Sequence, residues 1–324
     1  MVTWLLRRVV QAGAVVLAMT VLVFVGLHLV GNPVDLLISP EATQAERAQA
    51  IASMGFDQPL WRQYLVFLGN ALHGDLGRSF VFGAPAVQVI LQRLPATLEL
   101  AVCAVLLAVV IGVPLGLYAG LRPDGLMARG VMAGSILGFS LPTFWVGLML
   151  IMVFAVQLGW LPSTGRGRTV EVLGVGWSFL TWDGLRHLVL PAFNLALFNI
   201  SLMLRLTRAG VRETLPAEFI RYARARGLSP ARIVGVHVLK TIAIPIVTVM
   251  GLEFGSTVAF AVVTETIFAW PGVGKLIIDS INLLDRPVIV AYLMMIVVLF
   301  VGINLVVDLA YTWLDPRVRL AGRE

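Results

Sequence analysis

Charged residues are scarce in this chain, and the scarcity narrows the protein classes to which it can belong. Only 13% of its 324 residues are charged and 59% are apolar, and the mean hydropathy is +0.91. A soluble domain usually carries about 25% charged residues, so this chain has too little polar surface to cover a soluble enzyme. The same apolar content excludes intrinsic disorder. We therefore expect an integral membrane protein.

Cysteine is almost absent as well. The single cysteine, Cys103, lies inside an apolar run, which excludes an internal disulfide framework and a cysteine-based metal site. The four histidines are scattered and show no metal-ligand spacing. We therefore assign no metal site and expect this chain to bind no cofactor of its own.

Six apolar segments are long enough to cross a membrane. A helix needs about 20 mostly apolar residues to span the hydrocarbon core. The first segment is longer than the core of a signal peptide and no small-residue cleavage site follows it, so we interpret it as a retained span. The fold class is thus an all-α integral membrane protein with six transmembrane helices. The expected spans cover residues 9–30, 96–120, 131–158, 187–208, 242–268 and 288–313.

The distribution of Lys and Arg predicts the orientation of the spans. If the N-terminus is inside the cell, the inner segments hold 15 of the 24 basic residues and the longer outer segments hold 9. Basic residues accumulate on the cytoplasmic side of membrane proteins, so we expect a multi-pass protein with both termini in the cytoplasm. This bias also accounts for the net charge of +6, and we expect no nucleic-acid partner.

Two long connections organise the chain. Residues 31–95 form an outer segment with helix-like stretches near 41–53 and 59–72, and we expect a structured cap on the outer face because long unstructured loops are unusual. The other is the basic loop 209–240 on the inner side. The expected regions are a cytoplasmic N-terminus with the first helix at 1–30, the outer segment at 31–95, a core at 96–313 that contains the loop 209–240, and a cytoplasmic tail at 314–324.

The inner loop predicts two short helices separated by a sharp turn. Pro216 and Glu218 suit the first turn of a helix, and Gly227 suits the left-handed residue that ends it. Ser229 followed by Pro230 predicts the N-cap of a second helix that leads into the fifth span.

The first of these helices is amphipathic. Phe219, Ile220 and Ala223 form an apolar stripe, and Arg221 and Arg224 face elsewhere. A helix of about eleven residues is marginal alone and needs a surface on which to dock. Physical reasoning favours two surfaces equally, anionic lipid or a partner protein.

Several longer stretches of the sequence resemble a known family. MGFDQPLWRQYLVFL, HGDLGRSF and LQRLPATLEL within residues 54–100, RARGLSPARIVGVHVLK, and ETIFAWPGVGKLIIDSINLLDRPVIVAYL with NLVVDLAYTWLDPRVR near the C-terminus are similar to the B-type permease subunit of dipeptide, oligopeptide and nickel importers of the ATP-binding-cassette (ABC) class. Ala223 and Gly227, four residues apart, resemble the "EAA" loop of such permeases. The likeness covers essentially the whole chain.

The resemblance implies a type I ABC importer permease fold and a coupling role for the inner loop. In this family the short helix docks into a groove on the nucleotide-binding subunit. Two departures from the general pattern are Arg221 in place of Glu and the residues 237–240 in place of I-x-L-P. The residues implied to couple to the ATPase are Glu218, Phe219, Arg221, Tyr222, Ala223, Arg224, Gly227 and Leu228.

The resemblance also implies a set of partners. These are a homologous C-type permease, two ATP-binding-cassette ATPase subunits that bind ATP and Mg, an external solute-binding protein, and the lipid bilayer of a bacterial inner membrane. Subunits of this type serve dipeptides, longer peptides, glutathione and nickel complexes, so the resemblance indicates peptides or a related small solute.

The chain has no Walker A motif with which to bind ATP itself. Residues 269–276, AWPGVGKL, lack the first Gly and the Ser or Thr after Lys275, and we interpret Pro271, Gly272 and Gly274 as a turn. Energy must therefore come from another subunit or from an ion gradient. The ion-gradient alternative is a secondary transporter with Glu253 as a proton relay. We assign no catalytic residues, because no span pairs a Ser with a His as a hydrolase needs.

Polar residues follow one face of the fourth and one face of the fifth expected span. We expect these two stripes to line a translocation path, and the alternative is that they form hydrogen bonds across helices. Glu99, Glu265 and Asp308 lie near span ends and are expected to anchor or pair there. The predicted path residues are Asn194, Ser201, Glu253, Ser256 and Thr257.

Overall fold

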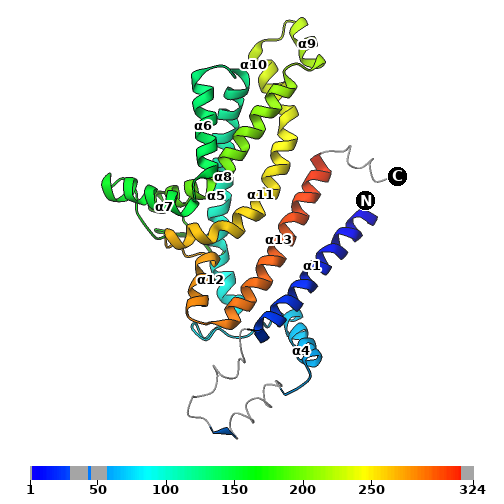
Figure 1. Cartoon of the computed structure of the whole chain (residues 1–324), viewed down its shortest axis with the longest axis vertical. Coiled ribbons are helices and arrows are strands. Elements are labelled where there is room, and N and C mark those ends of the chain that lie inside the picture. The colour runs from blue at the N-terminus through cyan, green and yellow to red at the C-terminus, as the bar shows by residue number, and fades with distance from the viewer. Residues whose placement is uncertain (1, 30–42, 45–56, 315–324) are drawn as a thin grey trace. The chain divides into compact units, whose positions relative to one another are not determined.

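The computed structural model describes residues 2–29, 43–44 and 57–314, and these residues are mostly helical (Figure 1). The chain divides into two compact units. Unit 1 comprises Met1–Gln92 with Asp279–Gly302, and unit 2 comprises Arg93–Ile278 with Ile303–Glu324. The predicted boundaries of the four regions stay predictions.

The helices have the lengths that a membrane-spanning chain requires. Within the described ranges, five helices are long and apolar enough to cross a membrane, and a bent pair makes a sixth crossing if it is counted as one span. The elements are α1 Val2–Leu29, α4 Leu60–Leu72, α5 Ala86–Leu121, α6 Leu126–Ser140, α7 Thr143–Leu150, the π-helix η1 Ile151–Gln157, the strands β1 Val170–Val172 and β2 Val175–Trp177, α8 Trp182–Thr214, α9 Glu218–Ala225, α10 Pro230–Arg232, the π-helix η2 Ile233–Val238, α11 Leu239–Ile267, α12 Val273–Asn282 and α13 Arg286–Leu314.

The bent pair corrects the prediction of a continuous third span at 131–158. α6 and the helix formed by α7 and η1 meet at an angle of 109°. Pro142 precedes α7, and the residue before it, Leu141, is extended with φ −77° and ψ 135°. A proline disfavours the α conformation in the residue that precedes it, so the helix ends there, and α7 projects sideways from unit 2 in Figure 1.

Two further predictions concern the helices of the outer segment and the turn before the last span. The predicted helix near 59–72 is confirmed as α4, whereas the one near 41–53 lies almost entirely outside the described residues. The predicted turn at Pro271–Gly274 is too long, because α12 already begins at Val273 and contains Gly274.

Unit 2 is held together by close packing of α5 against α8. Gly112, Gly116 and Gly120 are spaced four apart and lie on one face of α5. A Cβ atom at Gly116 would come within 2.5 Å of the backbone oxygen of Leu204 on α8. Small residues at this spacing let two membrane helices approach closely, so α8 is fixed along much of its length.

Candidate functional site

The segment between α8 and η2 forms two short helices joined by a turn at one end of unit 2, and we call these residues, 215–232, the elbow. α9 ends in a Schellman motif, in which the N–H of Gly227 donates to the carbonyl of Arg224 (2.9 Å) and the N–H of Leu228 donates to that of Ala223 (3.2 Å). Gly227 has φ +76°, which a residue with a Cβ adopts only at a cost. The predicted helix end at Gly227 is confirmed.

The predicted start of α10 is confirmed, whereas the predicted start of α9 is only partly confirmed. Ser229 is the N-cap of α10 and accepts from the N–H of Arg232, with Pro230 at the first helical position, as predicted. Glu218 lies in the first turn of α9, as predicted, but Pro216 does not, because α9 begins two residues later with Ala217 as its N-cap. Ala217 is in an extended conformation, so the chain enters the helix only at Glu218.

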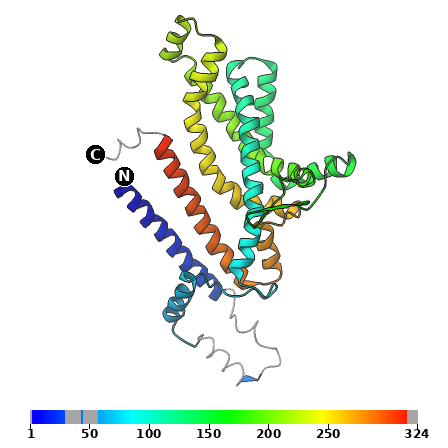
Figure 2. The same cartoon turned by 180° about the vertical axis from the view of Figure 1, so that it is seen from behind.

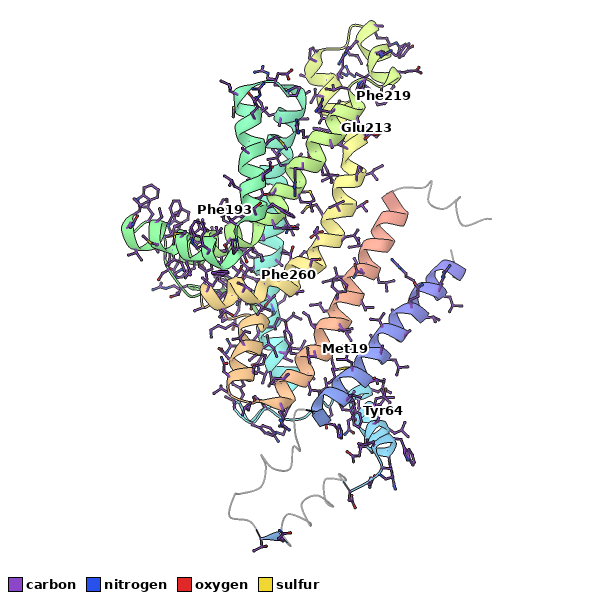
Figure 3. All side chains as sticks on the ribbon, in the orientation of Figure 1. Met19, Tyr64, Phe193, Glu213, Phe219 and Phe260 are labelled. Atoms are coloured by element: carbon purple, nitrogen blue, oxygen red, sulfur yellow. The ribbon has the colours of Figure 1, made fainter. Side chains whose placement is uncertain are left out.

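α9 has one buried side and one exposed side. Ile220 is fully buried and Ala223 is nearly so, and both belong to the hydrophobic core of unit 2 together with Ile233 and Val238 of η2. Of the predicted apolar stripe, Phe219 alone does not join this core and is 47% exposed. Figure 3 shows Phe219 on α9, away from the packed body of unit 2. Burial of Ile220 and Ala223 therefore fastens α9 while its aromatic residues stay accessible.

The exposed side of α9 is aromatic and basic. Tyr222 is 62% exposed, and the guanidinium of Arg226 lies 5.1 Å from the centre of its ring. Gly227 is exposed and Leu228 is half-buried. Five of the eight predicted coupling residues thus form one accessible surface, which we call the elbow surface: Glu218, Phe219, Arg221, Tyr222 and Arg224.

The polar residues of α8 and α11 meet inside unit 2. Asn194 is fully buried and its amide donates to Thr264 (3.0 Å). The amide of Asn199 donates to Thr257 (2.8 Å), whose hydroxyl donates to the carbonyl of Glu253 (2.7 Å). Hydrogen bonds thus join the polar stripe of α8 to that of α11. For Asn194 and Thr257 this agrees with the alternative that the polar residues bond across helices rather than line a path.

The other predicted path residues have different environments. Ser201 is buried and donates to the carbonyl of Leu197 in its own helix. Glu253 and Ser256 are partly exposed on α11. The structure therefore places Asn194 and Thr257 in the interface between α8 and α11. Glu253 and Ser256 remain partly exposed on the surface of unit 2.

Two buried carboxylates hold the other end of unit 2, and we call the group formed by Glu99, Glu265 and their hydrogen-bond donors the carboxylate clamp. Glu265 of α11 is fully buried and accepts from the hydroxyl of Thr97 on α5 (2.6 Å) and from the N–H of Lys275 (3.0 Å). The Thr97 oxygen in turn accepts from the N–H of Val273 (2.9 Å). The clamp therefore satisfies the first N–H groups of α12, where a negative charge is favourable.

The second carboxylate fastens the β-hairpin to α5. Glu99 accepts from the Arg166 guanidinium (Nε, 2.9 Å) and from the N–H groups of Ser178 (2.7 Å) and Phe179 (2.9 Å). Arg166 also donates to the carbonyl of Gly176 in β2 (2.7 Å). Figure 2 shows the two strands far from α9 within this unit. The expectation that Glu99 and Glu265 pair near span ends is confirmed, and the side chain of Asp308 lies outside the described residues.

Sequence reasoning missed the residues that satisfy these carboxylates. Thr97, Arg166 and Ser178 were not singled out, because nothing local marks a Thr, Arg or Ser as the partner of a distant Glu. The family resemblance is a signal for one of them, because Thr97 lies in a stretch that carries it, and the same is true of a comparable pair in unit 1, Ser79 and Asp285. Their side chains form a buried hydrogen bond, and Asp285 also accepts from the N–H of Phe80 (3.1 Å).

No metal centre is evident in the part of the chain that the structure describes, where no group of three His, Cys, Asp or Glu side chains is placed to hold an ion. The expectation that this chain binds no metal stays a prediction.

Two sequence families and many individual relatives match the chain. Residues 1–101 match the family "Binding-prot-dependent transport system membrane comp, N-term", and residues 112–320 match "Binding-protein-dependent transport system inner membrane component". The chain is 38% identical to the di/tripeptide transport system permease protein DppB of Pseudomonas aeruginosa, over 98% of this chain and 99% of that protein. It is also 38% identical to the oligopeptide transport system permease protein AppB of Bacillus subtilis, with the same coverage of both chains.

The fold also has a counterpart among solved structures. A chain of the methionine ABC transporter MetNI in an inward-facing conformation superposes with a TM-score of 0.55 at 20% identity, over 71% of this chain and 98% of that chain. At this identity the likeness shows the fold, and it confirms the predicted fold class. The permease relatives favour the importer interpretation over the ion-gradient alternative.

Proposed function

Because the chain belongs to the family of binding-protein-dependent transport system inner membrane components, we propose that it forms part of the route by which peptides enter a bacterial cell. It is a multi-pass inner membrane protein, a permease subunit and not an enzyme. The relatives are named as permeases for di/tripeptides and oligopeptides, which supports peptides as the cargo of this chain.

The energy for import comes from two separate ATPase subunits that bind ATP and Mg. The elbow surface docks onto one of them through Glu218, Phe219, Arg221, Tyr222 and Arg224. One observation carries this proposal: α9 buries Ile220 and Ala223 in the core of unit 2 and exposes two aromatic and several basic side chains on its other side. Exposed aromatic and Arg side chains are enriched at protein interfaces.

The elbow transmits the movement of the ATPase to the spans. Ala223 and Ile220 pack with Ile233 and Val238, and η2 continues without a break into α11. Gly227 and Leu228 close the end of α9, so a force on α9 moves η2 and α11 together rather than bending the loop. ATP binding then favours one of two packings of the spans, which is how a rigid-body switch works.

The remaining partners follow from the orientation. With both termini and the elbow in the cytoplasm, the β-hairpin end of unit 2 faces outward, where an external solute-binding protein delivers the peptide. A homologous C-type permease completes the membrane part, and the lipid bilayer surrounds both.

The peptide passes along a face of α8 and α11. Glu253 and Ser256 are the two predicted path residues that are partly exposed, which supports a direct role for them. Asn194 and Thr257 are buried and form hydrogen bonds between α8 and α11, and Ser201 is buried on α8. An ionisable side chain in the middle of a span is costly unless it faces protein or water, which supports a place for Glu253 beside the path.

Single-cysteine labelling tests this arrangement. The only cysteine, Cys103, is replaced by Ser, and Phe219→Cys or Leu173→Cys is introduced at the elbow or at the 98% exposed hairpin tip. A membrane-impermeant maleimide should label Leu173→Cys in intact spheroplasts and label Phe219→Cys only after lysis. In membranes that contain the whole transporter, Phe219→Cys should cross-link to an ATPase subunit. Labelling of Phe219→Cys from outside, or cross-linking only to lipid, would overturn the proposal.

A further inference from the structure

Helix α4 lies beside the C-terminal part of α1. Because α1 is expected to span the membrane, its contacts with α4 indicate the depth of α4 in the membrane. The Thr20 and Tyr64 hydroxyls are 2.8 Å apart, the Phe24 and Phe67 rings are 6.0 Å apart between centroids, and a ring nitrogen of His28 lies 3.1 Å from the side-chain oxygen of Gln63. Figure 3 shows Met19 and Tyr64 where the two helices meet.

This contact places α4 alongside the apolar part of α1. The part of α1 that is apolar and long enough to cross a membrane includes Leu6–Gly26. Thr20 is six residues from the end of this stretch, or about 9 Å along the helix axis at about 1.5 Å per residue. Tyr64 and Phe67 therefore lie at the depth of the hydrocarbon core, and only His28 with Gln63 reaches the level beyond Gly26.

A second face of α4 is apolar, and the described residues of unit 1 leave it exposed. Trp61, Leu65, Leu68 and Leu72 follow the spacing i, i+4, i+7 and i+11, which is one helix face. Trp61 is 65% exposed, Leu65 55% and Leu72 80%. We call these four residues the α4 stripe. The polar residues Arg62 and Asn70 are exposed on another side of the helix, together with Val66.

Exposed apolar side chains of α1 at the same depth as α4 indicate which environment surrounds this part of unit 1. Val21, Leu22 and Val25 of α1 are exposed in the outermost turns of a span, and an apolar surface at that depth is covered by lipid. Exposure of these apolar side chains to water instead would be unfavourable in proportion to their apolar area. A Trp at one end of such a helix is typical of the boundary between acyl chains and headgroups.

We propose that α4 is embedded in the leaflet at the C-terminal end of α1, with the α4 stripe against lipid acyl chains and Arg62 and Asn70 facing headgroups and water. α4 is then a half-inserted helix that widens the membrane part of the protein around α1. The sequence predicts a structured cap on the outer face for residues 31–95, and the proposal places α4 of this cap within the membrane. The proposal needs only that α1 spans the membrane, so it stands apart from cargo and energy source.

Spin-label accessibility in the complete transporter in lipid nanodiscs tests this placement. In a Cys103→Ser background, single cysteines are introduced at Trp61, Leu65 and Leu72, with Arg62 and Asn70 as matched positions on the same helix. Leu22→Cys supplies the lipid reference and Leu173→Cys the aqueous one. Oxygen is more soluble in lipid and a polar nickel chelate is more soluble in water. Labels on the α4 stripe should therefore show a higher collision rate with oxygen than with the chelate, as the label at Leu22 does. Labels at Arg62 and Asn70 should show the reverse order.

Each other outcome contradicts the proposal. If the nickel chelate reaches the α4 stripe as readily as it reaches Leu173→Cys, the helix lies in water. If the stripe labels are immobile and reached by neither reagent, another subunit covers them. A second measurement does not depend on labels: Leu65→Asp should lower the thermal unfolding midpoint of the transporter in nanodiscs, and Asn70→Asp on the same helix should leave it unchanged. Equal midpoints would also reject lipid as the occupant.

Discussion

The elbow and the carboxylate clamp hold segments of unit 2 by different forces. The elbow is fastened by two apolar side chains, Ile220 and Ala223, and by the backbone geometry at Gly227. The clamp is fastened by two buried carboxylates, Glu99 and Glu265, whose hydrogen-bond donors come from the same unit. The apolar contacts that attach α9 to unit 2 involve no charged side chain. In the clamp, by contrast, the acidic side chains themselves form the hydrogen bonds that hold the fold.

Under the proposed function, this difference separates a surface for a partner from an internal support. Arg221 and Arg224 remain exposed because apolar burial already anchors α9. At the clamp the charges are satisfied internally, so changes there should act on stability. Changes at the elbow should act on coupling to the ATPase.

The largest effect is expected at the centre of the clamp. Glu265→Ala removes the acceptor of the Thr97 hydroxyl and of the Lys275 N–H, and it leaves a cavity among buried residues. Each buried donor that is left without its acceptor costs about 1–3 kcal/mol, and the cavity adds to this loss. The thermal unfolding midpoint of the purified transporter should fall strongly. Glu265→Gln keeps the shape of the side chain and one acceptor oxygen, so its unfolding midpoint should fall less. An unchanged midpoint in Glu265→Ala would show that Glu265 does not stabilise unit 2.

A buried charge in the elbow should uncouple transport. Ala223→Asp places a carboxylate beside Ile233 and Val238 without a partner, which unseats α9 because burying an unpaired charge is strongly unfavourable. Peptide uptake and substrate-stimulated ATPase activity should fall by about tenfold or more, which corresponds to about 1.4 kcal/mol. Membrane insertion should be retained.

The matched control for this variant lies on the same helix. Ala225 is exposed, so Ala225→Asp should retain uptake and ATPase stimulation. If both variants behave alike, or if Ala223→Asp transports normally, the anchored side of α9 has no role in coupling.

A moderate effect is expected where Glu99 holds the hairpin. Arg166→Leu removes the charged donor to Glu99 and the bond to the Gly176 carbonyl, and a hydrogen bond to a charged group contributes about 1.5–3 kcal/mol. Amide hydrogen exchange in β1 and β2 should become faster, with ATPase coupling little changed. The exposed Arg168 supplies the control, since Arg168→Leu should leave exchange in β2 as it was. Equal exchange in both variants would contradict the clamp.

The smallest effect concerns backbone geometry. Gly227→Ala places a Cβ on a residue with φ +76°, in open space, so only backbone strain of about 1 kcal/mol opposes it. The unfolding midpoint should fall by a few degrees and coupling should weaken slightly. Gly235 in η2 is equally uncrowded but lacks a positive φ, so Gly235→Ala should not destabilise. A fall of the same size in Gly235→Ala would remove the special role of Gly227.

Local signals in the sequence predict much of the elbow. The end of α9 at Gly227 and the cap of α10 at Ser229 each depend on residues within one turn. The exposure of Phe219 was not predictable from its apolar character, because it depends on which side of α9 meets η2. The π-helical form of η2 has no local mark either, since it depends on packing of both Ile233 and Val238, five residues apart, into the same core.

Long-range contacts limit what the sequence predicts elsewhere. The donor to Glu265 lies 168 positions away at Thr97, so composition and spacing near Glu265 predict an anchor but not its partner. The break of the third span was marked by Pro142, yet a proline within an apolar run is compatible with either a kink or a full bend. The 109° angle is therefore not predictable from the proline alone, and neither is the position of Gly147 of α7 near Asn194 and Phe268.

The account depends most on the claim that this permease is driven by ATP hydrolysis on other subunits. The direct measurement is peptide uptake into proteoliposomes that contain the permeases, the ATPase subunits and the solute-binding protein, with ionophores present to abolish every ion gradient. We expect peptide to accumulate when ATP is supplied and to stop accumulating when the ATPases are left out. Accumulation that ionophores abolish while ATP is kept high, or that this chain supports without the ATPases, would contradict the account.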